Sequence, residues 1–273
     1  MKLVVKTLPQ LQRANGRVEI GFTSKNNSHS LTHLHQSGCL KALMPKNHSD
    51  IPEVVLINTA GGITGGDKLR IAVELKERVR ATVTTQTAER VYKAGHDLGK
   101  VEVQLNLKQD SFLDWLPQET ILFDKSALKR KITVNMHETS KLFMVESIIL
   151  GRCAMGETLT NNFFADHWRI LQDNKMRYAE SLKLSNASEL SGLATLGKNK
   201  ALATLLYVAS NAEEKVLHMR ALLKQCNLIS GASAWDGKLV TRLISDSPQR
   251  LRAALIFIIS KFRKKQLPRV WLM

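Results

Sequence analysis

A glycine-rich segment is the first place where residue types and spacing suggest chemistry. INTAGGITGGDKL, residues 57–69, places four glycines and a lysine after an apolar run. A phosphate-binding loop of the form GxxxxGK[ST] needs a lysine that reaches the terminal phosphates and a hydroxyl that holds magnesium. Gly61 and Gly66 have the required spacing, but Asp67 stands where the lysine belongs and neither Ser nor Thr follows Lys68. Because a carboxylate there would repel phosphate, the segment is not a nucleotide-binding loop of this type.

The same segment fails as a dinucleotide-binding fingerprint. The form GxGxxG needs glycine where this chain has Ile63, and it needs a helix next, whose N-terminus binds the pyrophosphate. A strand pattern follows instead, so we interpret the segment as a tight turn whose glycines permit positive φ or close packing. The sequence also has no nucleophile elbow, HExxH motif or paired catalytic carboxylates at motif spacing. An enzyme is therefore the least favoured class.

The elements that position this turn are predicted to be mainly strands. From about residue 50 to 185, apolar residues alternate with polar ones, as in half-buried strands, and many strands follow one another without intervening helices. The segment 168–184 is a predicted hairpin that turns at Asp173 and Asn174. Helices are expected late, over 211–226 and after the N-cap Ser247. We predict a mainly β protein with a small, mostly C-terminal helical portion.

Composition and charge leave several kinds of partner open. The chain has 273 residues, 44% of them apolar, and no linker or low-complexity tract, so a single domain over 1–273 is expected. The formal charge of +16 suits acidic proteins, nucleic acid or anionic lipid. Nucleic-acid binding is the alternative function class, although no recognised module for it occurs. Its basic residues near the C-terminus would be Arg250, Arg252, Lys261, Arg263, Lys264, Lys265 and Arg269.

Targeting segments are not evident in the sequence. MKLVVKTLPQ has too short an apolar run for a signal peptide, and AALIFII at 253–259 is far short of a membrane span. Three cysteines, Cys39, Cys153 and Cys226, lie far apart, so neither a disulfide framework nor a structural zinc site is expected. We expect a cytoplasmic protein without membrane association, with reduced and buried thiols.

Five blocks in order carry a resemblance to a known family. They are INTAGGITGGDKL, TTQTAERVYKAG at 84–95, DWLPQETILFD at 114–124, ILGRCAMGET at 149–158 and the terminal LPRVWLM. Together they resemble the UreD (UreH) family of urease accessory proteins, and the resemblance spans nearly the whole chain. It implies a non-enzymatic scaffold that binds apo-urease, UreF and UreG and assists nickel insertion into urease. It also implies β-helix-like stacked sheets, no tightly bound cofactor, and nickel only in transit.

A protein that passes a hard divalent cation needs oxygen ligands, which would appear as acids where an apolar residue is expected. Strand parity selects three such acids. Asp67 shares parity with Leu69 and Ile71, Glu146 with Met144 and Ile148, and Glu180 with Tyr178 and Leu182. We predict that Asp67, Glu146 and Glu180 line a transient nickel path.

The alternative for each acid is an ion pair with Arg or Lys in the core, or a position at a strand end in solvent. Asp114 is a weaker candidate because Pro117 suggests a strand end. SHSLTHLHQSGC offers a second metal possibility, in which His33 and His35 share a strand face with His29 and Cys39 nearby. Alternating polar residues on an exposed strand explain that pattern equally well.

Overall fold

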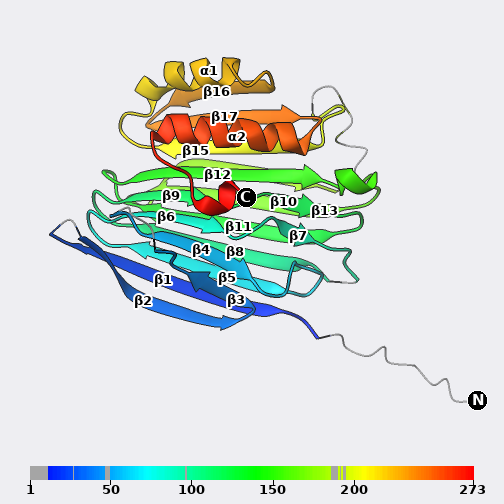
Figure 1. Ribbon diagram of the computed structural model, residues 1–273, viewed down its shortest axis with the longest axis horizontal. Coiled ribbons are helices and arrows are strands. Elements are labelled where there is room, and N and C mark those ends of the chain that lie inside the picture. Colours follow the sequence, from blue (N-terminus) through cyan, green and yellow to red (C-terminus); the bar gives the residue numbers. More distant parts are fainter. Residues whose placement is uncertain are drawn as a thin grey trace, which may run out of the picture.

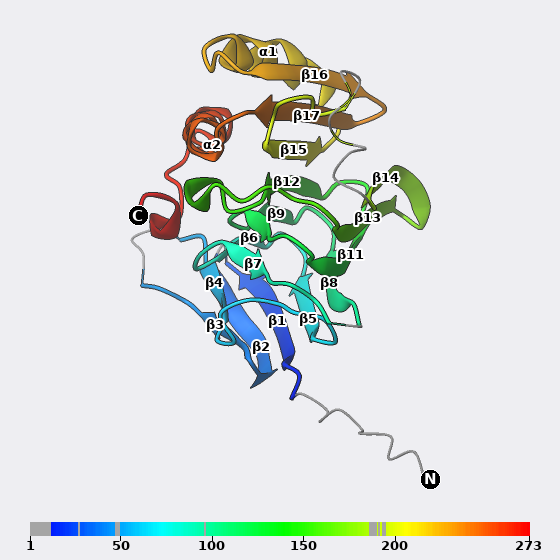
Figure 2. The same cartoon turned by 90° about the vertical axis from the view of Figure 1, so that its right-hand side faces the viewer.

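The computed structural model describes residues 12–26, 28–46, 50–95, 97–185, 190, 192 and 195–273. The N-terminal decapeptide, in which no signal peptide is expected, lies outside these residues, and so does the side chain of Cys153. The described chain is mainly strand, and its strands form two long sheets with an apolar core between them (Figures 1 and 2).

A seven-stranded sheet, here called sheet A, has the order β14-β13-β11-β8-β5-β1-β2. Its inner strands run parallel, whereas β2 and β14 pair antiparallel at the two edges. The bounds are β1 Asn15–Lys25, β2 Ser28–Gly38, β5 Lys68–Leu75, β8 Gly99–Leu107, β11 Ala127–Met136, β13 Phe163–Gln172 and β14 Lys175–Leu184.

A ten-stranded sheet, here called sheet B, has the main order β16-β17-β15-β12-β9-β6-β4-β3, and β10 pairs with both β12 and β7. The strands β4, β6, β9 and β12 are parallel, and the remaining strands of the main order pair antiparallel. The bounds are β3 Leu40–Leu43, β4 Glu53–Asn58, β6 Arg80–Thr85, β7 Glu89–Val91, β9 Phe112–Leu116, β10 Thr120–Leu122, β12 Lys141–Leu150, β15 Ala201–Val208, β16 Ile229–Trp235 and β17 Lys238–Ser245.

The chain alternates between the sheets: β4 and β12 of sheet B lead directly into strands of sheet A, and β6 and β9 do so after the short sheet B strands β7 and β10. Each passage adds one parallel strand to both sheets, which gives a β-solenoid-like stack from β1 and β2 at one end to β16 and α1 at the other (Figure 1). This confirms the mainly β fold of stacked sheets with a small helical portion late in the chain.

Side-chain alternation produces the core between the sheets. Leu69, Val73 and Leu75 of β5 are buried there, together with the matching residues of β8 and β11. The predicted hairpin is also confirmed: β13 and β14 pair antiparallel, and Asp173 and Asn174 have φ of 47° and 62°.

The glycine-rich segment joins β4 to β5 as a turn, as predicted. Gly62 sits against the next turn of the chain, since an added Cβ would lie 2.7 Å from the carbonyl oxygen of Arg90 and 2.3 Å from the ring of Tyr92. Gly61 and Gly66 have positive φ, of 75° and 91°. The segment therefore uses its glycines for close packing and for left-handed backbone.

Two helices and a second apolar core lie on the outer face of sheet B (Figure 2). The helix α2, Pro248–Arg263, begins as predicted, since Ser247 accepts a hydrogen bond from the Arg250 backbone N–H. The helix α1, Val216–Lys224, is shorter than the predicted 211–226 because a 3-10 turn, η3, precedes it. This 3-10 turn spans Glu213–Lys215, and the described residues also include the 3-10 turns η1 Cys153–Met155 and η4 Arg269–Trp271.

The thiol prediction needs a correction. Cys39 and Cys226 are free, but both are only partly buried, because Cys39 lies in the turn before β3 and Cys226 follows the end of α1. Among the described residues, no helix is both long and apolar enough to span a bilayer. The cytoplasmic location stays a prediction.

Candidate functional site

A cavity of about 160 Å³ lies between the two sheets, and we call it the inter-sheet cavity. Apolar side chains of sheet A, such as Val101 and Val103, form one wall. Trp115 and Glu146 of sheet B form the other, with Glu89 from the short strand β7. The parallel stack builds this space from successive turns of the chain, so polar groups far apart in sequence meet in it.

Glu146 lies on the inner face of β12 and is 4% exposed, which agrees with its predicted position on an apolar face. Its Oε1 accepts a 2.8 Å hydrogen bond from Trp115 Nε1, and its Oε2 accepts one from an Arg130 terminal nitrogen at 2.5 Å. Burial raises the pKa of Glu146 above its ordinary value, while the nearby guanidinium opposes that shift. The contacts of Glu146 are those of the alternative interpretation, a buried ion pair with an arginine in the core.

Arg130 completes a buried cluster that joins the sheets. Its Nε and second terminal nitrogen donate to the two oxygens of Asp166 at 2.9 and 2.6 Å. Trp168 Nε1 also donates to Asp166, at 3.0 Å. Burial lowers the pKa of Arg130, but Asp166 and Glu146 outweigh burial and raise it overall. One guanidinium faces two carboxylates here, so with both acids ionised the cluster carries one net negative charge.

Glu89 is the acid that the sequence reasoning missed. It is half-buried in β7 and lines the inter-sheet cavity. The Asn58 side-chain amide donates to its two oxygens at 3.2 and 3.3 Å, and no described cation forms an ion pair with it. Burial, with a smaller contribution from the charge of Asp67, raises the pKa of Glu89 to about 7 despite the opposing hydrogen bond from Asn58.

Asp67 is buried as predicted, but its partners are backbone groups. The N–H groups of Ala14 and Thr64 each donate to one carboxylate oxygen at 2.8 Å. These bonds tie the glycine-rich turn to the chain that enters β1, so Asp67 holds the end of the stack together. Asp67 is not among the residues that line the inter-sheet cavity.

Glu180 lies on β14 at the edge of sheet A, away from the inter-sheet cavity. It accepts a 3.0 Å hydrogen bond from Arg242 of β17 and another from the Tyr178 hydroxyl. Burial, followed by that hydrogen bond, raises the pKa of Tyr178 above its ordinary range. Glu180 thus links sheet A to sheet B at the surface, and the three predicted acids do not form one cluster.

Asp114 belongs to the opposite face of sheet B. Its neighbour Trp115 points inward to Glu146, so Asp114 points outward, where it pairs with Arg263 of α2 at 2.6 Å. Asp114 therefore cannot share a path with Glu146.

The histidine segment forms the exposed edge strand β2. His33 and His35 share a face, as predicted, and His33 lies 3.7 Å from Glu19. A bulge opposite Gly21 and Phe22 places His29 on the other face. In the part of the chain that the structure describes, no group of three His, Cys, Asp or Glu side chains is arranged to hold a metal. Whether His33 and His35 bind metal stays open.

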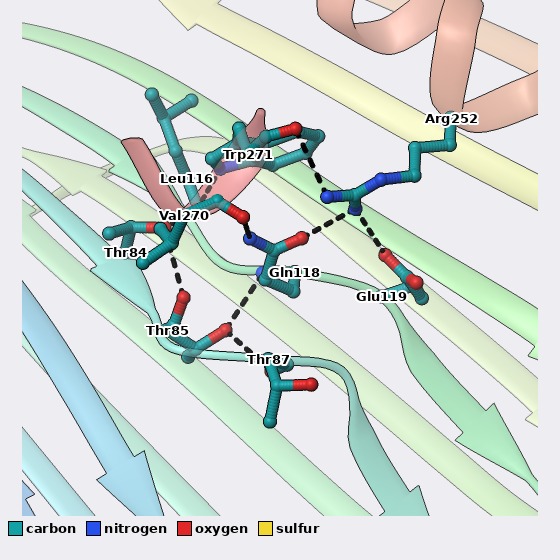
Figure 3. Close-up of polar contacts among 9 residues, drawn as sticks. All are labelled: Thr84, Thr85, Thr87, Leu116, Gln118, Glu119, Arg252, Val270 and Trp271. Atoms are coloured by element: carbon teal, nitrogen blue, oxygen red, sulfur yellow. Dashed lines mark hydrogen bonds and ion pairs between the residues drawn. The ribbon is translucent and has the colours of Figure 1, made fainter. Parts of the chain in front are cut away.

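The C-terminal segment packs against the outside of the cavity wall (Figure 3). Gln118, which lines the inter-sheet cavity, donates to the Val270 carbonyl at 2.8 Å. Arg252 donates to Gln118, to Glu119 and to the Trp271 carbonyl. Trp271 is 1% exposed, and its ring N–H donates to the Leu116 carbonyl at 3.1 Å. The segment thereby fixes the residues that follow β9.

These contacts also bear on the nucleic-acid alternative. Arg252 and Arg263, two of its basic residues, are bound to Glu119 and Asp114 within the chain. Arg250 pairs with Asp246 at the surface. Three of the seven basic residues proposed to contact nucleic acid therefore already pair with carboxylates of this chain, which makes the nucleic-acid alternative less favoured.

Fold and site together define a β-solenoid-like protein with a partly acidic cavity between its sheets. A family model described as UreD urease accessory protein matches residues 14–272. The UreD urease accessory protein of Rhizobium leguminosarum bv. trifolii is 41% identical over 263 residues, which cover 95% of this chain and 96% of that protein. The one from Dinoroseobacter shibae is 41% identical over 265 residues, covering 96% and 94% of the two chains.

This chain belongs to the UreD family of urease accessory proteins. Membership fits a role in urease maturation and implies a non-catalytic helper role.

Proposed function

We propose that this protein is a scaffold for urease maturation that binds apo-urease together with UreF and UreG and provides a route for nickel. In this proposal nickel is cargo, and no tightly bound cofactor is needed. The family membership and the acids of the inter-sheet cavity support it.

The single observation that carries the nickel route is the pair of carboxylates in one cavity. Glu89 and Glu146 both line the inter-sheet cavity, together with mainly apolar side chains and with polar ones that include Arg130 and Gln118. Oxygen ligands suit a divalent cation in transit, and few ligands favour release over tight retention.

The two carboxylates have different parts in this proposal. Arg130 occupies one oxygen of Glu146 and Trp115 the other, so Glu146 contributes mainly negative potential. Glu89 has no cationic partner of that kind in the described part of the chain, and its pKa of about 7 means that a proton occupies it part of the time at neutral pH. An arriving cation would displace that proton and take its place.

The transit role predicted for Asp67, Glu146 and Glu180 stays a proposal with unequal support. Glu146 lines the inter-sheet cavity, whereas Asp67 is held by backbone N–H groups and Glu180 lies at a sheet edge. We therefore assign Glu89 and Glu146 to the route, and Asp67 to holding the turn beside it.

Coexpression tests the scaffold. The chain is expressed with its cognate UreF, UreG and urease, and the complex is isolated by affinity and sizing. The proposal expects a complex containing urease and UreF, and poor urease activation when this chain is omitted. Failure to associate with either protein would remove the proposal. Retention on nucleic acid at physiological salt would favour the alternative instead.

A further inference from the structure

A second cavity, of about 330 Å³, lies on the outer face of sheet B beside the C-terminal end of α2, and we call it the outer pocket. Asp114, Phe143 and Tyr207 are buried at its floor. Exposed residues that include His218 and Lys264 form its rim. Sheet B separates the outer pocket from the inter-sheet cavity.

The floor of the outer pocket contains an incompletely bonded ion pair. Asp114 is 2% exposed; its Oδ2 accepts from an Arg263 terminal nitrogen at 2.6 Å and from Thr82 at 3.4 Å. Its Oδ1 and the Nε of Arg263 are both buried and have no hydrogen-bond partner among the described residues. Buried polar atoms are normally bonded, so one acceptor and one donor here call for a group from outside.

The walls are aromatic. Phe143 and Phe262 stack with ring centroids 5.3 Å apart, and Tyr207 meets Phe262 edge-on at 5.5 Å. His218 lies parallel to Phe262 at 6.1 Å. Such walls favour a flat aromatic guest.

The rim is mostly cationic. Lys215, Lys264 and Lys265 line the pocket, with Glu214 as the single acid besides Asp114. Lys264 ends α2 in the left-handed conformation and is exposed. Carboxylates that flank an aromatic guest would meet these lysines, while Glu214 would disfavour the higher charge of a phosphate.

We propose that the outer pocket is a docking site for a tyrosine flanked by acidic residues in a partner protein. A phenol hydroxyl can donate to Asp114 Oδ1, the buried acceptor on the pocket floor. The ring would lie against the half-buried Phe262, and the acids would pair with the rim lysines. This inference does not depend on nickel transit.

The test is titration of the full chain, in its complex with UreF if it needs that partner for solubility, with the peptide acetyl-Asp-Tyr-Glu-amide, followed by NMR or calorimetry. We expect saturable, millimolar binding, since one anchor side chain supplies little affinity. Replacing the peptide tyrosine by phenylalanine should weaken binding about tenfold, because the bond to a buried carboxylate is lost. Replacing both peptide acids by amides should also weaken it.

Two charge reversals on α2 provide a matched comparison. Lys264→Glu changes the rim and should weaken the peptide, whereas Lys261→Glu, exposed on the same helix outside the pocket, should not. Neither site is buried, so both variants should fold. Asp114→Asn, where it folds, should abolish the preference for tyrosine over phenylalanine.

Several outcomes would overturn the proposal. They are no binding of the peptide, equal affinity for its tyrosine and phenylalanine forms, or equal loss in both lysine variants. Tighter binding of guanosine monophosphate than of the peptide would assign the pocket to a nucleotide and also overturn it.

Discussion

The two faces of sheet B each carry a buried pairing of arginine with carboxylate, and the two pairings differ in completeness. On the inner face, Arg130 binds Glu146 and Asp166, and every carboxylate oxygen of that cluster has a donor. On the outer face, Arg263 and Asp114 leave one donor and one acceptor unbonded. The inner cluster is closed, and the outer one is open.

This difference separates structural charges from functional ones. A saturated cluster holds the sheets together and has no free oxygen for a ligand, so Glu146 supplies only negative potential to the proposed nickel route. Within the described residues, Asp114 has an oxygen without a hydrogen-bond donor, and the Glu89 side chain is bonded by an amide and by no cation, so both acids can accept a ligand. We therefore look for ligand binding at the incomplete sites and for stability at the complete one.

Removing the centre of the closed cluster should have the largest effect. Arg130→Met leaves Glu146 and Asp166 buried without their cation, which should lower the free energy of unfolding by about 3 to 5 kcal/mol or prevent folding. Urea unfolding measures it, with Lys129→Met at the exposed neighbouring position as control. Equal stability of the two variants would show that the cluster is dispensable.

Replacing Asp67 should have the second largest effect on stability, because two backbone N–H groups donate to its carboxylate. Asp67→Ala leaves the N–H groups of Ala14 and Thr64 without acceptors, at a loss of about 3 kcal/mol. Asp67→Asn should lose about half of that, since an amide offers one acceptor. If the asparagine variant were fully stable but failed in urease activation, Asp67 would belong to the nickel route after all.

Glu89 should make the stability of the protein depend on pH. The fold raises its pKa from 4.5 to about 7, so the native state binds more protons than the unfolded state between these values. Stability contributed by the neutral acid is therefore complete below about pH 4.5 and lost as pH rises through 7. Glu89→Gln should remove this dependence and raise stability at pH 8 by about 3 kcal/mol. Unfolding midpoints across pH, compared with those of wild type, measure it; unchanged profiles would contradict the assignment.

The smallest effect should come from the surface pair between the sheets. A double-mutant cycle on Arg242 and Glu180 should give a coupling below about 1 kcal/mol, since the Arg242 side chain is 62% exposed. A coupling energy of about 3 to 5 kcal/mol, as expected for the Arg130 cluster, would show that Glu180 is a structural charge like Glu146 and Asp166.

Strand parity predicted most of the fold because side chains alternate strictly along a strand. Parity identified Asp67 and Glu146 as inward-facing. It also indicates an inward-facing cation that could pair with an inner-face acid. Arg130 lies between Leu128 and Ile132 at the same parity, so a cation on the inner face was readable from the sequence.

Other features of the structure could not be predicted from strand parity. Glu89 lies in a three-residue strand, too short to show a period. The bulge that separates His29 from His33 depends on the partner strand β1, and the position of Glu180 depends on β14 being an edge. The open pair of Asp114 and Arg263 joins residues 149 positions apart, and no local pattern connects them.

Nickel loading tests the central claim most directly, that the inter-sheet cavity carries the ion. The complex with UreF, UreG and urease is assembled with wild type, with Glu89→Gln, or with Glu102→Gln, whose carboxylate is exposed on sheet A. Nickel per urease active site is then measured by metal analysis alongside complex yield. The account predicts a severalfold loss of nickel for Glu89→Gln alone, with all three complexes intact. Wild-type nickel loading by an intact Glu89→Gln complex would contradict it.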